Sequence, residues 1–132
     1  PMAERIPLGV MIETPAAVFI AEDLAKEVDF FSIGTNDLSQ YLLAIDRQNA
    51  MVHSFYHKKN PAILRAIKEV VEKGKQAGIS VGVCGEFAAD PDFTAFFLHL
   101  GVDKLSMNGP SILPIKKKIL SCDSGKELDR IP

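Results

Sequence analysis

The sequence lacks the features that mark several common classes of protein. No apolar run approaches the roughly 18 to 20 residues that span a bilayer, and residues 1–5, Pro-Met-Ala-Glu-Arg, do not have the layout of a signal peptide. We therefore expect a soluble, cytoplasmic protein that does not contact membranes. The formal net charge is only -2, and the basic residues are dispersed apart from the three lysines at 116–118. This distribution gives no electrostatic footprint for nucleic acid.

Cysteine is also scarce. The two cysteines, Cys84 and Cys122, are too few for a secreted disulfide scaffold, and their spacing does not fit a set of metal ligands. The three histidines, His53, His57 and His99, form no recognisable catalytic arrangement. Each cysteine therefore has to be judged by its own surroundings.

What the sequence does contain is a regular alternation of short apolar runs and helical patterns. A chain of 132 residues with 47% hydrophobic residues is large enough for one domain with a core. The order is β-α-β-α-α-β-α-β-α, which predicts a parallel sheet with right-handed crossovers. The expected strands are residues 8–12, 30–33, 79–83 and 104–107. The expected helices are residues 14–29, a short one from about 38, then 61–78, 91–100 and 111–120.

Two segments fall outside this alternation. Residues 46–60 show no clear period and have the length of an irregular excursion that is usually functional. Residues 121–132 have little apolar content and are expected to be poorly ordered, which leaves residues 1–120 as the domain. Four βα units are half of an eight-stranded barrel, but a closed barrel usually needs about 250 residues. Length alone therefore favours a small, open, doubly wound sheet.

Polar side chains follow three of the predicted strands where each strand ends. They are Glu13, then Asn36 and Asp37, then Cys84 and Glu86. The carboxyl ends of parallel strands lie on one rim, where α/β folds bind their ligands. Two carboxylates there suit Mg²⁺, which commonly takes one or two protein carboxylates and fills its other positions with water and substrate oxygens. The alternative is that Glu13 and Asp37 only cap the helices that follow.

Three further residues have both a functional and a purely structural interpretation. Asn36 is either a ligand-binding amide or a turn or N-cap residue. Arg47 lies at the start of the irregular segment, where its guanidinium could grip a phosphate or carboxylate, or could simply be exposed. Cys84 could be a partly exposed thiol that transfers protons, or a small core residue.

Four stretches together resemble one family. They are residues 9–17 (GVMIETPAA), 29–38 (DFFSIGTNDL), 46–49 (DRQN) and 82–86 (GVCGE). In this order and combination they resemble the phosphoenolpyruvate-binding barrel of Enzyme I of the bacterial sugar phosphotransferase system, whose relatives include pyruvate phosphate dikinase and phosphoenolpyruvate synthase. The resemblance implies that the chain is the C-terminal half, about four βα units, of a (β/α)₈ TIM barrel.

The resemblance also implies a set of roles. Glu13 and Asp37 would hold Mg²⁺, Asn36 and Arg47 would contact phosphoenolpyruvate, and Cys84 would protonate the enolate carbon. The implied reaction transfers a phosphoryl group from phosphoenolpyruvate to a protein histidine and releases pyruvate. In the full enzyme the phosphoryl group then passes to the histidine-containing phosphocarrier protein.

The sequence departs from the family in ways that limit this inference. The family's phosphorylated histidine lies in a separate domain, so none of the three histidines inherits that role and the chain alone is expected to be inactive. Residues 108–110, Asn-Gly-Pro, stand where the family more often has small residues. Three alternatives therefore stay open: a domain of the pyruvate phosphate dikinase or phosphoenolpyruvate synthase type, a magnesium-dependent enolate lyase, and a non-catalytic binding module. Open strand edges, together with the dimeric state of the family, predict a homo-oligomer.

Overall fold

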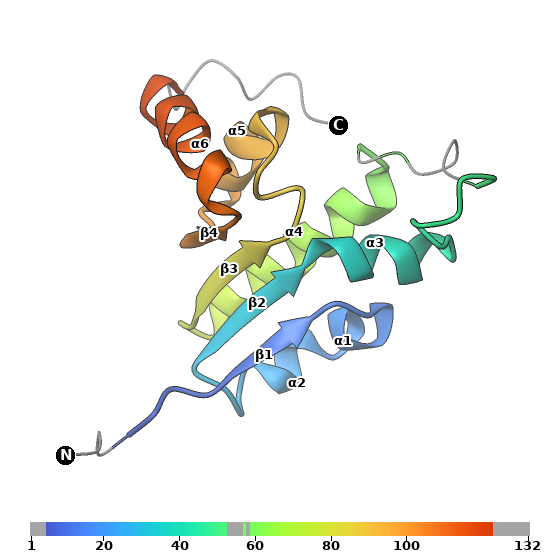
Figure 1. The fold of residues 1–132 in the computed structure, drawn as a ribbon. Helices are drawn as coiled ribbons and strands as arrows, with labels where there is room; N and C mark the ends of the chain where they lie inside the picture. Colours follow the sequence, from blue (N-terminus) through green and yellow to red (C-terminus); the bar gives the residue numbers. More distant parts are fainter. Residues whose placement is uncertain (1–4, 53–56, 58, 123–132) are drawn as a thin grey trace.

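The sheet has four parallel strands whose order in space is their order in the chain. The computed structural model describes residues 5–52, 57 and 59–122. The strands are β1 (Gly9–Ile12), β2 (Phe30–Gly34), β3 (Ser80–Cys84) and β4 (Lys104–Ser106), in the order β1-β2-β3-β4 (Figure 1). Because successive right-handed crossovers all advance in one direction, they place their helices on one side of the sheet. The parallel sheet is thus confirmed. The order does not reverse direction as that of a doubly wound sheet does, so this part of the expectation from length was wrong; within the described residues the sheet is open, with β1 and β4 at its edges.

The helices follow the predicted alternation with strands, but several of them begin or end at residues other than those expected. They are α1 (Pro15–Phe19), α2 (Ala21–Leu24), α3 (Thr35–Leu43), α4 (Pro61–Gln76), α5 (Pro91–Leu100) and α6 (Gly109–Ser121). The single helix expected over 14–29 is wrong, because Ile20, with φ -105° and ψ 16°, interrupts it. Ile20 is β-branched and half exposed, so neither propensity nor burial favours a continuous helix there. In the described part of the chain, none of these helices has the combination of length and apolar character needed to cross a bilayer.

Three helix starts follow the sequence signals closely. Thr14, Asn60 and Asp90 are the N-caps of α1, α4 and α5, and each precedes a proline at the first turn. Their side-chain oxygens accept hydrogen bonds from backbone N–H groups two or three residues further on, at 3.2, 2.9 and 3.0 Å. These bonds satisfy N–H groups that have no partner within the helix.

The two segments predicted to be irregular, residues 46–60 and 121–132, lie only partly within the described residues. In the described residues of 46–60, backbone N–H groups bond to the side chains of Asp46 and Asn49, and there is no helix or strand. His53 lies outside the described residues. A poorly ordered tail was expected from residue 121, but α6 includes Ser121; residues 123–132 lie outside the described part.

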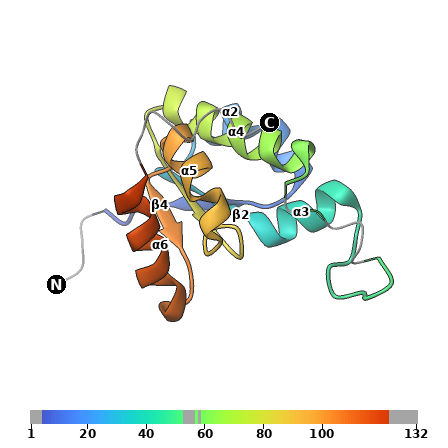
Figure 2. The ribbon, with the colours of Figure 1, turned by 90° about the horizontal axis from the view of Figure 1, so that it is seen from above.

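The core lies between the sheet and α4. Figure 2 shows α4 and α2 together on one side of the sheet, and α4 packs against β2 and β3. Gly74 permits a close approach there, since a Cβ at that position would lie 2.4 Å from Cγ2 of Val81. The buried side chains at this contact are Phe31, Ile33, Ile63, Ile67, Val70, Val71, Val81 and Val83.

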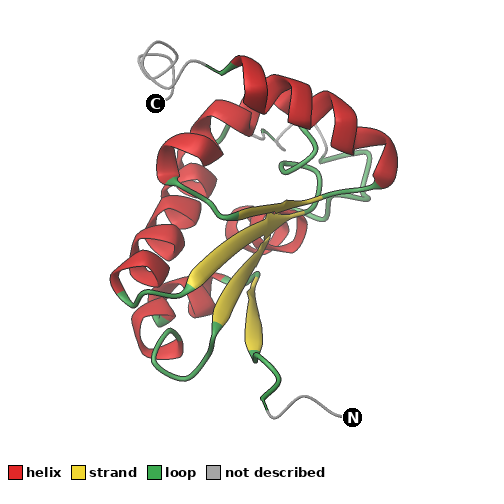
Figure 3. Ribbon diagram, turned by 90° about the vertical axis from the view of Figure 1, so that its left-hand side faces the viewer, coloured by secondary structure: helices red, strands yellow, loops and turns green. Residues whose placement is uncertain are grey.

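The opposite face of the sheet is less covered. Figure 3 shows helices along one side of the sheet and over β4, while no helix of the described residues covers the other side of β1 and β2. Strand register places Met11, Ser32 and Gly82 side by side on this face. Met11 is 44% exposed, and Lys104 Nζ lies 5.8 Å from the centre of the Phe30 ring. We call this the open face of the sheet.

The starts of β2 and β4 share one feature. Asp29 accepts a hydrogen bond from Leu8 N at 2.8 Å and donates its own N–H to Leu8 O at 2.7 Å. Asp103 does the same with Val81, at 2.8 and 2.9 Å. Both aspartates belong to the pattern Val-Asp-x-x-Ser, at residues 28–32 and 102–106. This short repeat was not among the features predicted from the sequence.

Candidate functional site

Glu13, the predicted site residue that directly follows β1, lies beside the end of β2. Because Ile12 pairs with Ile33, the next residue, Glu13, comes beside Gly34. A Cβ on Gly34 would lie 2.9 Å from Glu13 Oε2, so glycine leaves the space that the carboxylate fills. The N-cap of α1 is Thr14, so Glu13 does not cap that helix. Among the described residues, the Glu13 carboxylate has no hydrogen bond or ion pair.

The start of α3 carries the next two predicted residues. The helix begins at Thr35, earlier than expected, and its N-cap is Gly34 without a side-chain hydrogen bond. Asn36 and Asp37 therefore both lie inside the first turn, and Asn36 is not an N-cap. A carboxylate in the first turn is also favoured by the helix dipole, which contributes to the placement of Asp37 whether or not it binds a ligand.

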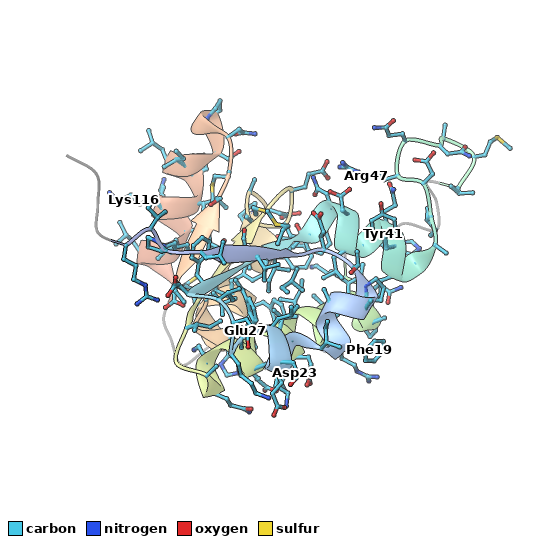
Figure 4. All side chains as sticks on the ribbon, turned by 90° about the horizontal axis from the view of Figure 1, so that it is seen from below. Phe19, Asp23, Glu27, Tyr41, Arg47 and Lys116 are labelled. Atoms are coloured by element: carbon cyan, nitrogen blue, oxygen red, sulfur yellow. The ribbon has the colours of Figure 1, made fainter. Side chains whose placement is uncertain are left out.

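Arg47 returns to the start of α3 from the segment beyond it. The turn is made by Ala44, whose backbone is left-handed with φ 53°, and the Arg47 N–H then donates to Gln40 Oε1 at 3.4 Å. Arg47 Nη2 lies 4.0 Å from Asp37 Oδ1, with side chains 32% and 46% exposed. Figure 4 shows Arg47 beside α3 where this segment begins. The loop thus brings the predicted arginine next to a predicted metal ligand.

The end of β3 is joined to the end of β2. Asn36 Oδ1 accepts a hydrogen bond from Glu86 N at 3.0 Å, which leaves the amide nitrogen with two donors for another partner. Asn36 also lines a cavity of about 720 Å³ at the ends of β2, β3 and β4. Its other lining residues are Gly85, Glu86, Ala89, Asp90, Pro91, Ser106, Met107 and Asn108.

Cys84 is placed differently from the other candidates. Its sulfur lies on the open face of the sheet, 3.4 Å from Ile33 O, 3.7 Å from Ser32 Oγ and 3.8 Å from Met11 Sδ. The side chain is partly exposed, so it is not the buried core residue of the structural alternative. The thiol can donate its proton to the Ile33 carbonyl while Ser32 donates to the sulfur.

The structure therefore brings the predicted residues to one end of the sheet without closing them into one cluster. Asp37 contacts Arg47, and Asn36 contacts the β3 end that carries Cys84. No group of three or more His, Cys, Asp or Glu side chains suited to a metal is found in the described ranges. Two carboxylates with substrate and water oxygens would be enough for Mg²⁺.

Sequence reasoning missed the residues that hold this end together. The Thr35 hydroxyl is completely buried and donates to Cys84 O at 2.7 Å. Gly85 has φ 96°, a conformation that favours glycine. A glycine and a threonine beside the candidate residues were visible in the sequence, but the contact between them depends on the register of β2 against β3.

The pKa shifts that the structure shows lie away from this rim. A hydrogen bond from Lys73 lowers the pKa of the Glu22 carboxyl, and the same bond raises the pKa of Lys73. Likewise, the Lys26 ammonium lowers the pKa of Asp23. These pairs lie on and between helices and belong to the scaffold.

The fold and these strand ends define an α/β domain whose candidate site lies at the carboxyl ends of a parallel sheet. Residues 1–124 match the family described as PEP-utilising enzyme, PEP-binding domain. The chain belongs to this family.

Curated relatives agree with that assignment. The chain is 49% identical over 118 residues to a phosphoenolpyruvate-protein phosphotransferase of Geobacillus stearothermophilus, and the match includes 89% of the chain and 20% of the relative. It is 47% identical over 130 residues to that of Buchnera aphidicola subsp. Acyrthosiphon pisum, covering 97% and 23%. A multiphosphoryl transfer protein 2 of Escherichia coli is 45% identical over 124 residues, covering 94% and 15%. The chain thus spans between 15% and 23% of the length of these relatives.

Proposed function

We propose that this chain is part of a phosphoenolpyruvate-protein phosphotransferase, which transfers a phosphoryl group from phosphoenolpyruvate to a protein histidine and releases pyruvate. The observation that carries the proposal is 49% identity to such an enzyme over 89% of the chain. Fold alone would not support it, because α/β folds host many chemistries. The residues gathered at the rim supply the chemistry that the reaction needs.

The architecture we propose is the C-terminal half of a (β/α)₈ TIM barrel. Support comes from the sequential order of four parallel strands, with helices on one side and an open face on the other. In a closed barrel the open face would point inward and would be covered by side chains of the remaining strands.

We propose that Glu13 and Asp37 hold Mg²⁺. The donor set is suitable, because both are carboxylates at adjacent strand ends and Glu13 occupies a space that Gly34 leaves open. A magnesium ion bound there would neutralise negative charge on the phosphate and carboxylate oxygens of the substrate.

The other residues then have distinct tasks. The Asn36 amide nitrogen donates to a phosphate oxygen, since its oxygen is already held by Glu86 N. Arg47 offers a fork of donors to the phosphate or carboxylate, and its 4.0 Å separation from Asp37 leaves it able to reorient. Cys84 gives the proton of its thiol to the methylene carbon of enolpyruvate, and the resulting thiolate regains a proton from water.

The proposal extends to partners and location. The histidine-containing phosphocarrier protein would accept the phosphoryl group from the full-length enzyme. A catalytic thiol must stay reduced, and the cytoplasm maintains that state, so we place the reaction there.

The decisive experiment incubates the full-length protein with Mg²⁺, phosphate-labelled phosphoenolpyruvate and a histidine-containing phosphocarrier protein. We expect label on the carrier and an equal amount of pyruvate. Release of an aldehyde or acyl product would instead indicate an enolate lyase. If phosphoenolpyruvate bound without turnover in the full-length protein, the chain would belong to a non-catalytic binding module.

A further inference from the structure

Two consecutive side chains of α3 bind the backbone on both sides of one glycine. The Thr35 hydroxyl donates to Cys84 O at 2.7 Å, and Asn36 Oδ1 accepts from Glu86 N at 3.0 Å. Gly85 lies between these two bonds. We call this arrangement the Thr35–Asn36 clamp.

The clamp is closely packed. A Cβ on Gly85 would lie 2.8 Å from Asn36 Oδ1 and 2.8 Å from Thr35 Oγ1, closer than any ordinary contact. The backbone of Gly85 is also left-handed, with φ 96°. Glycine is therefore required here by both space and conformation.

The clamp acts on the residue that carries the thiol. Thr35 fixes the carbonyl of Cys84, the last residue of β3, while the thiol of the same residue contacts Ile33 O and Ser32 Oγ. The backbone and the side chain of Cys84 are thus tied separately to the β2–α3 segment. Sheet pairing with Gly34 and Ser106 also holds the Cys84 backbone, so loss of the Thr35 bond would free the Cys84 carbonyl from its side-chain partner without separating the strands.

We propose that Thr35 is a positioning residue, which holds Cys84 so that its thiol keeps one orientation on the open face of the sheet. This role rests on the proposed function in so far as the thiol delivers a proton: the new C–H bond forms at the methylene carbon of enolpyruvate as the S–H bond breaks, giving pyruvate and a thiolate. The orientation of the thiol itself can be tested without any turnover.

The chain offers a matched control. Thr94 is 1% exposed, and among the described residues its hydroxyl has no hydrogen-bond partner. Thr94→Val and Thr35→Val therefore delete the same group from two buried positions, but only the second deletes a hydrogen bond. Thr35→Ser keeps the hydroxyl and should restore the wild-type behaviour.

The first measurement is the rate at which iodoacetamide alkylates Cys84 in the full-length protein, followed by mass spectrometry of the peptide that contains it. We expect Thr35→Val to raise this rate about fivefold, the factor that corresponds to one net hydrogen bond. Thr35→Ser and Thr94→Val should stay close to wild type. Equal rates in Thr35→Val and Thr94→Val, or no restoration by Thr35→Ser, would overturn the proposal.

The second measurement separates positioning from general destabilisation. With phosphoenolpyruvate as substrate, Thr35→Val should lower kcat for pyruvate formation and leave KM unchanged, and Thr35→Ser should recover kcat. A parallel change of kcat and KM would contradict a positioning role.

If the wild type formed no pyruvate, the proposed function would fail, whereas the alkylation rates would still decide whether Thr35 positions Cys84. Should Thr35→Val not fold, Gly85→Ala replaces it: forcing the clamp apart should raise alkylation, and an unchanged rate would refute the role.

Discussion

Cys84 is the candidate residue whose surroundings differ most from those of the rim. Its sulfur lies among Ser32, Met11 and a backbone carbonyl on the open face, with no charged group among these three contacts.

Replacing Cys84 should separate two steps of the proposed reaction. In the full-length protein, Cys84→Ala should lower the rate of pyruvate formation by about 10²-fold or more, since general acid catalysis commonly contributes that much. Phosphorylation of the protein histidine in a single turnover should change far less. The two rates can be followed by rapid quench, and an equal loss of both would refute the role of the thiol.

The two proposed magnesium ligands can be tested without turnover. Glu13→Gln and Asp37→Asn keep the shape of each side chain but remove its charge, so each should weaken Mg²⁺ binding at least about tenfold. Titration calorimetry of the full-length protein with MgCl₂ measures this. Glu27→Gln is the control, because Glu27 is exposed and lies near α2, away from Arg47 (Figure 4). A loss as large in the control would point to unspecific electrostatics.

The positions of the candidate residues could be predicted from the sequence, but their contacts could not. Glu13 and Asp37 each follow a short apolar run, so their place at strand ends is a local property. The bond from Thr35 to Cys84 depends on β2 lying beside β3 in one register, across 49 residues of chain. Local patterns do not carry that register.

Among the elements, α3 carries an unfavourable residue at its C-terminal end. The backbone of Ala44 is left-handed with φ 53°, a conformation that costs an L-residue with a Cβ about 1 to 2 kcal/mol. α5 ends at the equivalent position with Gly101, φ 69°. Both positions suit glycine, but only α5 has a glycine there.

Ala44→Gly should therefore stabilise the protein by about 1 kcal/mol. Gly101→Ala is the opposite exchange and should destabilise it by a similar amount. Both effects can be read from urea denaturation followed by circular dichroism. A destabilising Ala44→Gly would show that another contact of the methyl group outweighs backbone strain.

The ion pair between α2 and α4 gives a pH-dependent contribution to stability. Lys73 Nζ lies 2.9 Å from Glu22 Oε2, and this bond lowers the pKa of Glu22 from its ordinary value of 4.5 and raises that of Lys73 from 10.5. The contribution of the lowered carboxyl is present above pH 4.5 and is lost as pH falls through the folded-state pKa of Glu22. That of the raised amine is present below pH 10.5 and is lost as pH rises through the folded-state pKa of Lys73.

Lys73→Met should accordingly be less stable than wild type at pH 7 and equal to it in acid below the pKa of Glu22. Because Glu22 is exposed and Lys73 is partly exposed, the difference should also shrink in high salt. Denaturation midpoints at several pH values measure it, and Lys26→Met, which breaks a pair within one turn of chain, is the comparison. A difference that persists at low pH would mean that packing of the lysine stem, not charge, is responsible.

At the scale of the whole molecule, the chain leaves apolar surface uncovered. Ile6 and Leu8 are 79% and 63% exposed, and Met11 is 44% exposed on the open face. Within the described residues, β1 and β4 are the edge strands, and unpaired edges beside apolar surface favour association. The order of the strands could not be predicted from their patterns, because an open sheet and a barrel use the same βα units.

We expect this chain, expressed alone, to self-associate at micromolar concentration, and Met11→Lys to reduce that association. Sedimentation velocity over a range of concentrations measures both. A compact monomer at all concentrations would contradict the prediction. Glu27→Lys, a charge change at an exposed position near α2, should leave association unchanged.

Asp29 and Asp103, at the starts of β2 and β4, bear on how the strands find their register. Asp29 holds Leu8, just before β1, and Asp103 holds Val81 in β3, each by both its N–H and its C=O and within the same Val-Asp-x-x-Ser pattern. The boundary between β2 and β3 has Gly78 and Ile79 in that place instead. The two aspartates therefore mark the register of their strands, because a shift of either strand by one residue would break both hydrogen bonds at once.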